Sequence, residues 1–542
     1  MKVKVAAIQF SPGFKKYEEN MGKIEVLLKN AYEQGSQLSV LPEMCTTGYI
    51  FDNRDDIRDY VETVPGKTTD RLCELATLYK MHIVIGLAEK DSDDIFYNTA
   101  ALIGPEGFIG KYRKIHQFIA DPLWSADGDL GFEVFETKLG KIGMCICFDM
   151  NVEETCAVLD RKGCEIFCAP SNWFGERPIS PVWITRAYEF EKPVIVSNRT
   201  GKERNTVFDG ISCIIDNQGN ILASTKEVEG LAIAEVDIKR TQPRIKKFFY
   251  KDLSRHTYGW NPNWFFKQTS RKLPKGEDFQ AAVLQIKKSD CGMFSENKKL
   301  IKKMIVDELN TNTKVVVFPE GILNGIDKEI HYDDVVAFAG DLCTILSNYD
   351  GYVALSGIIK EAGKISSRIF LIGKKGIVAQ YKRIYHGEEI IDDYGIKPEF
   401  IDTEYGRISM MFGDELINME PIRCMSLEAV DMLLIPEKDG SGYNRYYDRF
   451  ELLWSLAGVR ARENNIYVLY ANYIGGNSIG FSGIFGPDSF VRRNDFVYSE
   501  RLQGSVKMMI YLRENTRVFP MNRVKYKPMM HFRKPYFYRE LF

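Results

Sequence analysis

The sequence lacks long apolar runs, a strong net charge, and cysteine pairs at the spacing of a zinc site. Over 542 residues the formal net charge is −2, which argues against nucleic acid or a membrane surface as a partner. No apolar stretch approaches the length that spans a bilayer. The opening residues MKVKVAAIQF are soon interrupted by polar ones, so we expect no secretory signal.

The eleven cysteines lie mostly inside apolar segments such as CICF and GCEIFC, and they do not form CxxC pairs. This distribution is typical of reduced thiols in a cytoplasmic protein. It predicts no metal site, and we expect no cofactor. The contents of apolar residues (45%) and charged residues (27%) are those of an ordinary globular protein. The information in this chain therefore lies in the order of its residues.

The sequence repeats itself once, at offsets of 266 to 277 residues. Six segments of the first half recur in the same order in the second half. Four of these pairs are VAAIQF (5–10) with AAVLQI (281–286), LSVLPE (38–43) with VVVFPE (315–320), KYRKIH (111–116) with QYKRIY (380–385), and FETKLGKIGMCICFD (135–149) with IDTEYGRISMMFGDE (401–415). The chain is therefore predicted to contain two copies of one domain, copy one over 1–272 and copy two over 273–542.

Strand-like and helix-like segments alternate within each copy. In copy one, the strand-like 5–10 is followed by an amphipathic helical pattern over 21–34 and by the strand-like 38–43. This alternation predicts an α/β fold, a sandwich of two sheets with helices outside in αββα layers. The copies end in basic, aromatic segments, 239–276 and 523–542. We interpret these as arms packed on a neighbouring domain or subunit rather than as RNA-binding tails.

Three reactive side chains follow predicted strands of copy one. Glu43 follows LSVLP, Lys114 lies in KYRKIH, and Cys147 ends the buried strand KIGMCIC. Because layered α/β proteins gather their active sites at strand ends, we expect these side chains to lie close together. The carboxylate takes the thiol proton, and the thiolate attacks a carbonyl carbon. The lysine and backbone N–H groups near Phe148 then hold the oxyanion, which suffices for acyl transfer from a C–N bond without a histidine.

In both halves the sequence resembles the nitrilase superfamily, the carbon–nitrogen hydrolases. The resemblance lies in LPE followed by GY, YRKIH, GKIGMCICFD, PSNW, and RAYE followed by SNRTG. It implies Glu43 as general base, Lys114 as the residue that positions the oxyanion, and Cys147 as nucleophile. It also implies the αββα fold, a thioester intermediate and no metal. The Phe148–Asp149 pair after the cysteine is similar to that of the amide-cleaving members.

The same resemblance points to four substrate-binding positions. Many members carry a second active-site glutamate, and by spacing Asp121 takes its place. Asn172 and Trp173 are expected to wall the acyl pocket beside Phe148, although Trp173 serves equally well as a core anchor. Asn151 stands where the family carries an arginine, which favours a neutral or cationic substrate over the amide of a dicarboxylate.

Copy two carries Glu320, Arg383 and Gly413 at the positions that match the catalytic three. Glycine cannot form a thioester, so we expect copy two to fold but to be inactive. Because members of the family assemble as dimers, the resemblance implies an intramolecular pseudo-dimer, and further association into a homo-oligomer stays open. The retained Glu320 also leaves open a regulator bound in a vestigial pocket.

We therefore expect a cytoplasmic thiol amidohydrolase that cleaves a non-peptide C–N bond of a small-molecule amide through a cysteine thioester. One alternative is an N-carbamoyl amidohydrolase, which also releases carbon dioxide. Others are an ammonia-supplying domain for a synthetase and a scaffold protein without catalytic activity.

Overall fold

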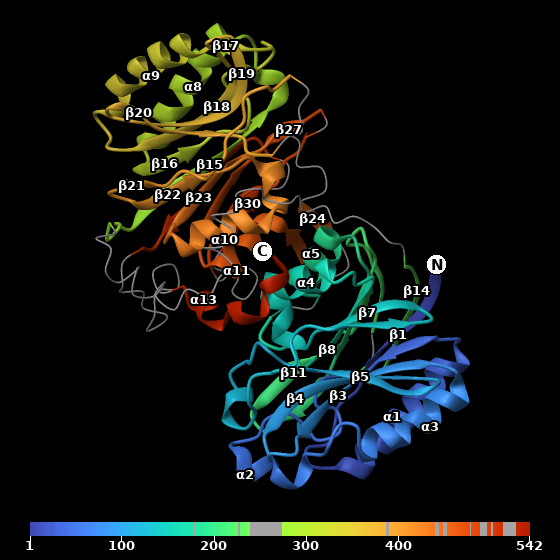
Figure 1. Cartoon of the computed structure of the whole chain (residues 1–542). Helices are drawn as coiled ribbons and strands as arrows, with labels where there is room; N and C mark the ends of the chain where they lie inside the picture. The colour runs from blue at the N-terminus through green and yellow to red at the C-terminus, as the bar shows by residue number, and fades with distance from the viewer. Residues whose placement is uncertain are drawn as a thin grey trace. The chain divides into compact units, whose positions relative to one another are not determined.

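The computed structural model describes residues 1–176, 179–225, 228–238, 274–385, 390–438, 444–447, 452–476, 478–487, 496–499, 502–512 and 527–541. These residues form two compact units (Figure 1). The first unit contains the described residues of 1–238 together with 532–541, and the second contains those of 274–531. The domain boundary expected between residues 272 and 273 lies outside the described residues.

The first unit begins with a mixed six-stranded sheet in the order β14-β1-β2-β3-β4-β5. Its two central pairs, β1 with β2 and β2 with β3, are parallel. The strands are β1 (Lys2–Gln9), β2 (Leu38–Val40), β3 (His82–Lys90), β4 (Phe96–Gly104), β5 (Gly107–Arg113) and β14 (Gly230–Asp237). A tight turn joins β4 to β5, as the sequence GPEG predicts.

The second sheet of this unit has the order β13-β12-β9-β8-β7-β6, with parallel pairs β7–β8 and β8–β9. Its strands are β6 (Val134–Thr137), β7 (Gly140–Met144), β8 (Ile166–Ser171), β9 (Val194–Asn198), β12 (Cys213–Ile215) and β13 (Ile221–Ser224). The sheets face each other, since β1 packs against β9 and β3 against β8. A separate hairpin joins β10 (Thr200–Glu203) and β11 (Thr206–Asp209).

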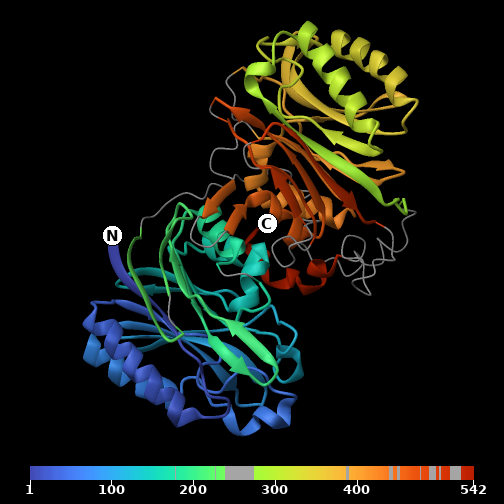
Figure 2. The same cartoon turned by 180° about the vertical axis from the view of Figure 1, so that it is seen from behind.

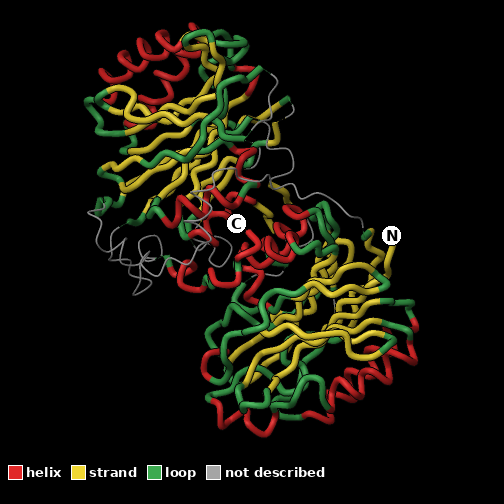
Figure 3. The backbone as a smooth tube through the Cα atoms, in the orientation of Figure 1, coloured by secondary structure: helices red, strands yellow, loops and turns green. Residues whose placement is uncertain are grey.

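Helices cover the outer face of each sheet (Figures 2 and 3). On the first sheet lie α1 (Tyr17–Glu33) and α3 (Lys67–Tyr79), and on the second lie α4 (Glu153–Arg161) and α5 (Pro181–Phe190). Along α1 the residues Met21, Ile24 and Leu28 recur at helical spacing and are fully buried against the first sheet. The short helices of this unit are α2 (Arg54–Ile57), η1 (Arg58–Tyr60), η2 (Asp121–Leu123) and η3 (Cys147–Asn151).

The second unit repeats this architecture. One sheet runs β20-β19-β18-β16-β15-β27-β28, with β17 beside β18 and β31 beside β15, and the other runs β21-β22-β23-β26-β29-β30. The strands are β15 (Phe279–Lys287), β16 (Thr313–Val317), β17 (Ile330–His331), β18 (Tyr352–Glu361), β19 (Lys364–Gly373), β20 (Gly376–Lys382), β21 (Ile401–Thr403), β22 (Gly406–Met410), β23 (Met432–Pro436), β24 (Asn444–Tyr447), β25 (Leu452–Ser455), β26 (Tyr467–Ala471), β27 (Tyr473–Gly475), β28 (Ser478–Ile479), β29 (Ser482–Phe485), β30 (Phe496–Ser499) and β31 (Gly504–Ile510). The helices are η4 (Lys288–Asp290), α8 (Phe294–Leu309), α9 (Tyr332–Leu346), η5 (Gly413–Ile417), α10 (Met419–Leu427) and α11 (Leu456–Asn464). The chain ends with α13 (Pro528–Phe532), η6 (Pro535–Phe537) and η7 (Arg539–Leu541).

The predicted fold class is confirmed, because two α/β sandwiches with outer helices occur in tandem. The helix predicted over 21–34 begins four residues earlier, at Tyr17. Within the described part of the chain, no helix combines the length and the apolar character needed to cross a membrane.

Candidate active site

Cys147 begins the short 3-10 helix η3 that follows the central strand β7. The strand ends at Met144, so the prediction that it continues to Cys147 was wrong at that end. Cys147 has a φ of +47°, a strained conformation for a residue other than glycine. Asp149 holds this turn, because its Oδ2 accepts the Ile146 N–H at 2.8 Å. The sequence CFD thus forms a tight turn in which Cys147 is 5% exposed. We call it the nucleophile turn, after the role that the sequence predicts for Cys147.

Glu43 and Lys114 form a fully buried ion pair. The Lys114 Nζ lies 2.7 Å from Glu43 Oε1 and 2.7 Å from Asp121 Oδ2. The Asn98 amide nitrogen donates to the same two carboxylates, at 2.7 and 3.1 Å. The structure therefore brings Glu43, Lys114 and Asp121 together, and it adds Asn98, which the sequence reasoning missed.

Backbone close to Glu43 fixes its carboxylate in place. The backbone N–H of Asn172 donates to Glu43 Oε2 at 2.8 Å. On the other side, Gly86 of β3 passes behind the glutamate, and a Cβ there would lie 2.5 Å from the Cα of Glu43. Only glycine permits this close approach of the two backbones.

The surroundings of the three predicted catalytic side chains, Cys147, Glu43 and Lys114, raise the pKa of each above its usual value. Burial raises the pKa of the Cys147 thiol, the charge of Glu43 raises it further, and the Lys114 ammonium opposes both. Burial also raises the pKa of Glu43, against the lowering effect of Lys114. Burial lowers the pKa of Lys114, but the carboxylates of Asp121 and Glu43 outweigh it, so its pKa lies above its usual range. A thiol with a raised pKa needs a base to become a thiolate, and the charge of Glu43 acts on Cys147 more strongly than that of Asp121.

Two buried polar side chains at the site lack a hydrogen-bond partner among the described residues. They are the Asn172 amide, through both its oxygen and its nitrogen, and the Tyr49 hydroxyl. Tyr49 also places its ring centre 5.9 Å from Lys114 Nζ. Buried polar groups are generally hydrogen-bonded, so each exception calls for a partner such as a water molecule, an ion or a polar ligand. Tyr49 belongs to the GY that follows LPE, so the sequence carried a signal for it.

Aromatic side chains surround the nucleophile turn. Phe148 packs on Phe118 at a centroid distance of 5.0 Å, and Phe118 packs on Phe174 at 5.7 Å. Trp173 donates its indole N–H to Glu176 at 2.7 Å and packs edge-on against Trp183. These contacts favour the interpretation of Trp173 as a core anchor, while its predicted substrate contact stays a prediction.

The matching position in copy two holds a hydrogen-bonded network of arginine and acidic side chains in place of a thiol. Arg383 lies 2.7 Å from Glu320 and 2.6 Å from Asp414. A Cβ on Gly413 would lie 2.0 Å from Glu437 Oε2, so the glutamate occupies the space that a cysteine side chain would need. Gly413 does not adopt a positive φ, in contrast to Cys147.

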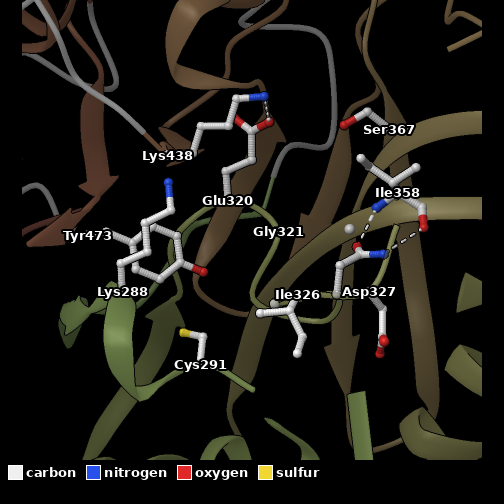
Figure 4. A pocket seen from close by; sticks show the side chains of 13 residues that line it. Lys288, Cys291, Glu320, Gly321, Ile326, Asp327, Ile358, Ser367, Lys438 and Tyr473 are labelled. Atoms are coloured by element: carbon white, nitrogen blue, oxygen red, sulfur yellow. Dashed lines mark hydrogen bonds and ion pairs between the residues drawn. The ribbon is translucent and has the colours of Figure 1, made fainter. Parts of the chain in front are cut away.

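A pocket of about 250 Å³ opens beside this network in copy two. Glu320 and Lys438 line one side of it, and Tyr473, Lys288 and Cys291 also contribute (Figure 4). Burial raises the pKa of Glu320 to about 8, although Arg383 and Lys438 act to lower it. The regulator that the sequence analysis left open for copy two stays a prediction.

Comparison with known proteins identifies the family. The sequence profile described as "Carbon-nitrogen hydrolase" matches residues 4–246 and 280–492. A "Nitrilase" from Pyrococcus abyssi is 39% identical over 239 residues, which cover 44% of this chain and 90% of that protein. "Omega-amidase NIT2" of Xenopus tropicalis is 28% identical, over 41% of this chain and 84% of that protein.

Solved structures also match. Saccharomyces cerevisiae Nit3, a member of branch 10 of the nitrilase superfamily, covers 44% of this chain and 90% of its own, with 26% identity and a TM-score of 0.40. An amidase from Nesterenkonia sp. covers 45% of this chain and 90% of its own, with 20% identity and a TM-score of 0.39. The two profile matches together span more than half of the sequence, so the chain belongs to the carbon–nitrogen hydrolase family and is an enzyme of that class, as its motifs predicted.

Proposed function

We propose that this carbon–nitrogen hydrolase, of the amidase type, cleaves the C–N bond of a small-molecule amide through a thioester on Cys147. The observation that carries the proposal is the fully buried pair of Glu43 and Lys114, whose charges act on the Cys147 thiol. The names of the relatives, a nitrilase and an omega-amidase, support the same class of reaction.

In the first half-reaction, Glu43 takes the thiol proton while Sγ of Cys147 attacks the amide carbon. The carbonyl oxygen becomes an oxyanion, held by the Lys114 ammonium and the backbone N–H of Phe148. Glu43 then gives its proton to the nitrogen, the C–N bond breaks, and ammonia or an amine leaves. A thioester between the acyl group and Cys147 remains.

In the second half-reaction, water replaces the amine. Glu43 takes a proton from water as the oxygen attacks the thioester carbon, and the oxyanion forms again beside Lys114. When the C–S bond breaks, Glu43 returns the proton to the sulfur, and the acid departs. Asp121 supports this cycle because its carboxylate accepts a second hydrogen bond from Lys114 Nζ, at 2.7 Å, and so holds the lysine in place.

The substrate side of the proposal rests on Asn172, Phe148 and Asn151. The Asn172 amide is buried without a partner among the described residues, so it is suited to bind a polar group of the substrate. Phe148 and its aromatic neighbours suit an apolar acyl portion. Asn151 supplies no charge where the family carries arginine, which supports a neutral or cationic substrate. We also propose that copy two is inactive and acts structurally as one half of a pseudo-dimer.

The test is trapping of the thioester. The purified full chain is incubated with small amides, N-carbamoyl amines and nitriles, and its intact mass is measured after rapid quenching. We expect an acyl adduct that maps to Cys147 and is absent from Cys147→Ala. Cys145→Ala is the matched control, because Cys145 is buried two residues earlier and its thiol contacts Met150. It should keep the adduct.

The outcomes separate the alternatives. A carbamoyl adduct with release of carbon dioxide would replace the amide proposal with an N-carbamoyl amidohydrolase. An adduct that persists in Cys147→Ala would refute the role of that cysteine. Absence of turnover and of any adduct across the panel would favour a scaffold protein.

A further inference from the structure

The last residues of the chain pack within the first unit, although they follow copy two in the sequence. We call residues 532–541 the C-terminal segment; they cluster with copy one rather than with the domain that precedes them. Its final turn, η7, packs against α4, the helix that follows the nucleophile turn (Figure 1). The basic, aromatic end of the sequence thus lies beside the turn that carries Cys147.

Tyr538 connects this segment to the nucleophile turn through two buried residues. Its hydroxyl lies 2.8 Å from His116 Nε2, and His116 Nδ1 lies 2.8 Å from Asp149 Oδ1. Tyr538, His116 and Asp149 are all fully buried. Asp149 is the residue that holds the strained turn at Cys147, since its other oxygen accepts the Ile146 N–H.

The contact of Lys534 with Tyr538 favours one direction for the hydrogen bonds that link Tyr538, His116 and Asp149. The Lys534 N–H donates to the Tyr538 oxygen at 2.8 Å, so the Tyr538 proton is available for His116 Nε2. With Tyr538 as the donor, His116 Nε2 accepts, and Nδ1 is the ring atom that donates to Asp149. Tyr538 thus selects the imidazole tautomer that bonds to the carboxylate of the nucleophile turn.

Two further contacts reach the same turn. The ring of Phe532 packs edge-on against Phe148 at 4.7 Å, and Phe148 is the residue whose N–H faces the oxyanion in the proposed mechanism. The Arg533 guanidinium bonds to Glu154 at 2.6 Å, with the two side chains 5% and 0% exposed. Glu154 lies in the first turn of α4. The segment therefore contacts both ends of the stretch from Cys147 to α4.

Copy two supplies an internal comparison. Glu415 stands where Asp149 does, and it likewise binds a tyrosine hydroxyl and the N–H that precedes the turn. Tyr385, whose N–H donates to Glu415, occupies the position of His116. The imidazole that bonds to the C-terminal segment is thus present in the copy that keeps the cysteine and is replaced in the copy that has lost it.

We infer that the C-terminal segment is a positioning element of the active site, in which Tyr538, through His116 and Asp149, holds the turn that presents Cys147. This inference rests on the proposed function of Cys147 as nucleophile. Tyr538 touches no reacting atom in this scheme; it acts by fixing the geometry of the thiol and the adjacent N–H groups. Small displacements of reacting groups typically lower rates by up to about 100-fold.

The test compares Tyr538→Phe with Tyr536→Phe in the full-length chain. The first variant removes one buried hydroxyl and keeps the ring; the second removes an exposed hydroxyl of the same segment, whose residue is 59% exposed. We expect Tyr538→Phe to lower kcat by about tenfold with little change in KM. Iodoacetamide serves as a second probe, and alkylation of Cys147, followed by intact mass, should slow to a similar extent.

A double-mutant cycle separates positioning from general stability. In His116→Asn the side-chain amide can still donate to Asp149 but is too short to reach Tyr538. Adding Tyr538→Phe to this variant should therefore lower neither kcat nor the alkylation rate of Cys147 any further. Equal rates for Tyr538→Phe and Tyr536→Phe would overturn the inference, as would independent effects of the two changes in the cycle. Iodoacetamide needs no substrate, so absence of an acyl adduct in the unmodified chain would refute the proposed function without deciding this inference.

Discussion

The two copies keep the same frame around the turn after the central strand and differ in what fills it. In copy one the Tyr112 hydroxyl and the Ile146 N–H bind Asp149; in copy two the corresponding groups bind Glu415. Only copy one places a thiol inside this frame, in a strained backbone conformation. Both copies therefore keep the carboxylate that caps the turn, whereas the strained backbone occurs only where the turn carries a cysteine.

The second difference concerns the cation. Lys114 fits between Glu43 and Asp121 without reaching solvent, while Arg383 extends to Asp414, whose side chain is half exposed. The backbone N–H of Lys114 donates to the carbonyl oxygen of Asn98, and that of Arg383 donates to the carbonyl oxygen of Ser367. Copy two therefore has the smaller side chain, Ser367 in place of Asn98, beside the larger cation, Arg383 in place of Lys114.

The largest effect is expected from giving copy one the cation of copy two. Lys114→Arg should lower kcat/KM by about 1000-fold, because the guanidinium does not fit the space bounded by Asn98 and two carboxylates and displaces the oxyanion donor. Steady-state kinetics on the substrate found in the trapping experiment measure this loss. The control is Arg383→Lys, which should leave turnover within twofold. A comparable loss in the control would mean that copy two takes part in catalysis.

Some residues of the site could be predicted from the sequence, and others could not. The internal repeat and the strand ends predicted that Glu43, Lys114 and Cys147 share one site, because buried strands carry a strong local pattern. The ion pair of Glu43 with Lys114 agrees with this prediction. No sequence pattern marked Asn98, because it lies inside β4 among other strand residues. The contact between His116 and Tyr538 joins residues 422 positions apart, and nothing local encodes it. The basic, aromatic composition of the C-terminal segment predicted that it is an arm, but it did not predict which surface the arm covers.

A smaller effect is expected from the pocket side of the same site. Asn172→Ala should raise KM about tenfold and leave the melting temperature unchanged, because its side-chain amide has no partner among the described residues. Trp173→Phe is the contrasting variant. It should lower the melting temperature with KM little changed, since the indole N–H is bonded to Glu176. The opposite pattern would make Trp173, rather than Asn172, the substrate contact.

The last expected effect concerns stability rather than turnover and tests the vestigial site of copy two. Burial raises the pKa of Glu320 to about 8, so the folded chain retains a proton there that the unfolded chain releases near pH 4.5. Stability should therefore fall as pH rises from about 4.5 to 8 and should level off above, with a contribution of at most about 1.4 kcal/mol per pH unit. Glu320→Gln has no such proton, so its melting temperature relative to the unmodified chain should rise between pH 5 and pH 8.

The exposed Glu399→Gln serves as the control for this pH series, because it removes a carboxyl of the same copy without touching the pocket. Its melting temperature relative to the unmodified chain should stay constant over the same range. If Glu320→Gln behaved in the same way, Glu320 would be ionised and held by Arg383, and copy two would retain the buried ion pair of copy one. If the melting temperature rises as expected, the loss of the lysine has turned a catalytic carboxylate into a neutral pocket acid, and the copies differ in charge as well as in the nucleophile.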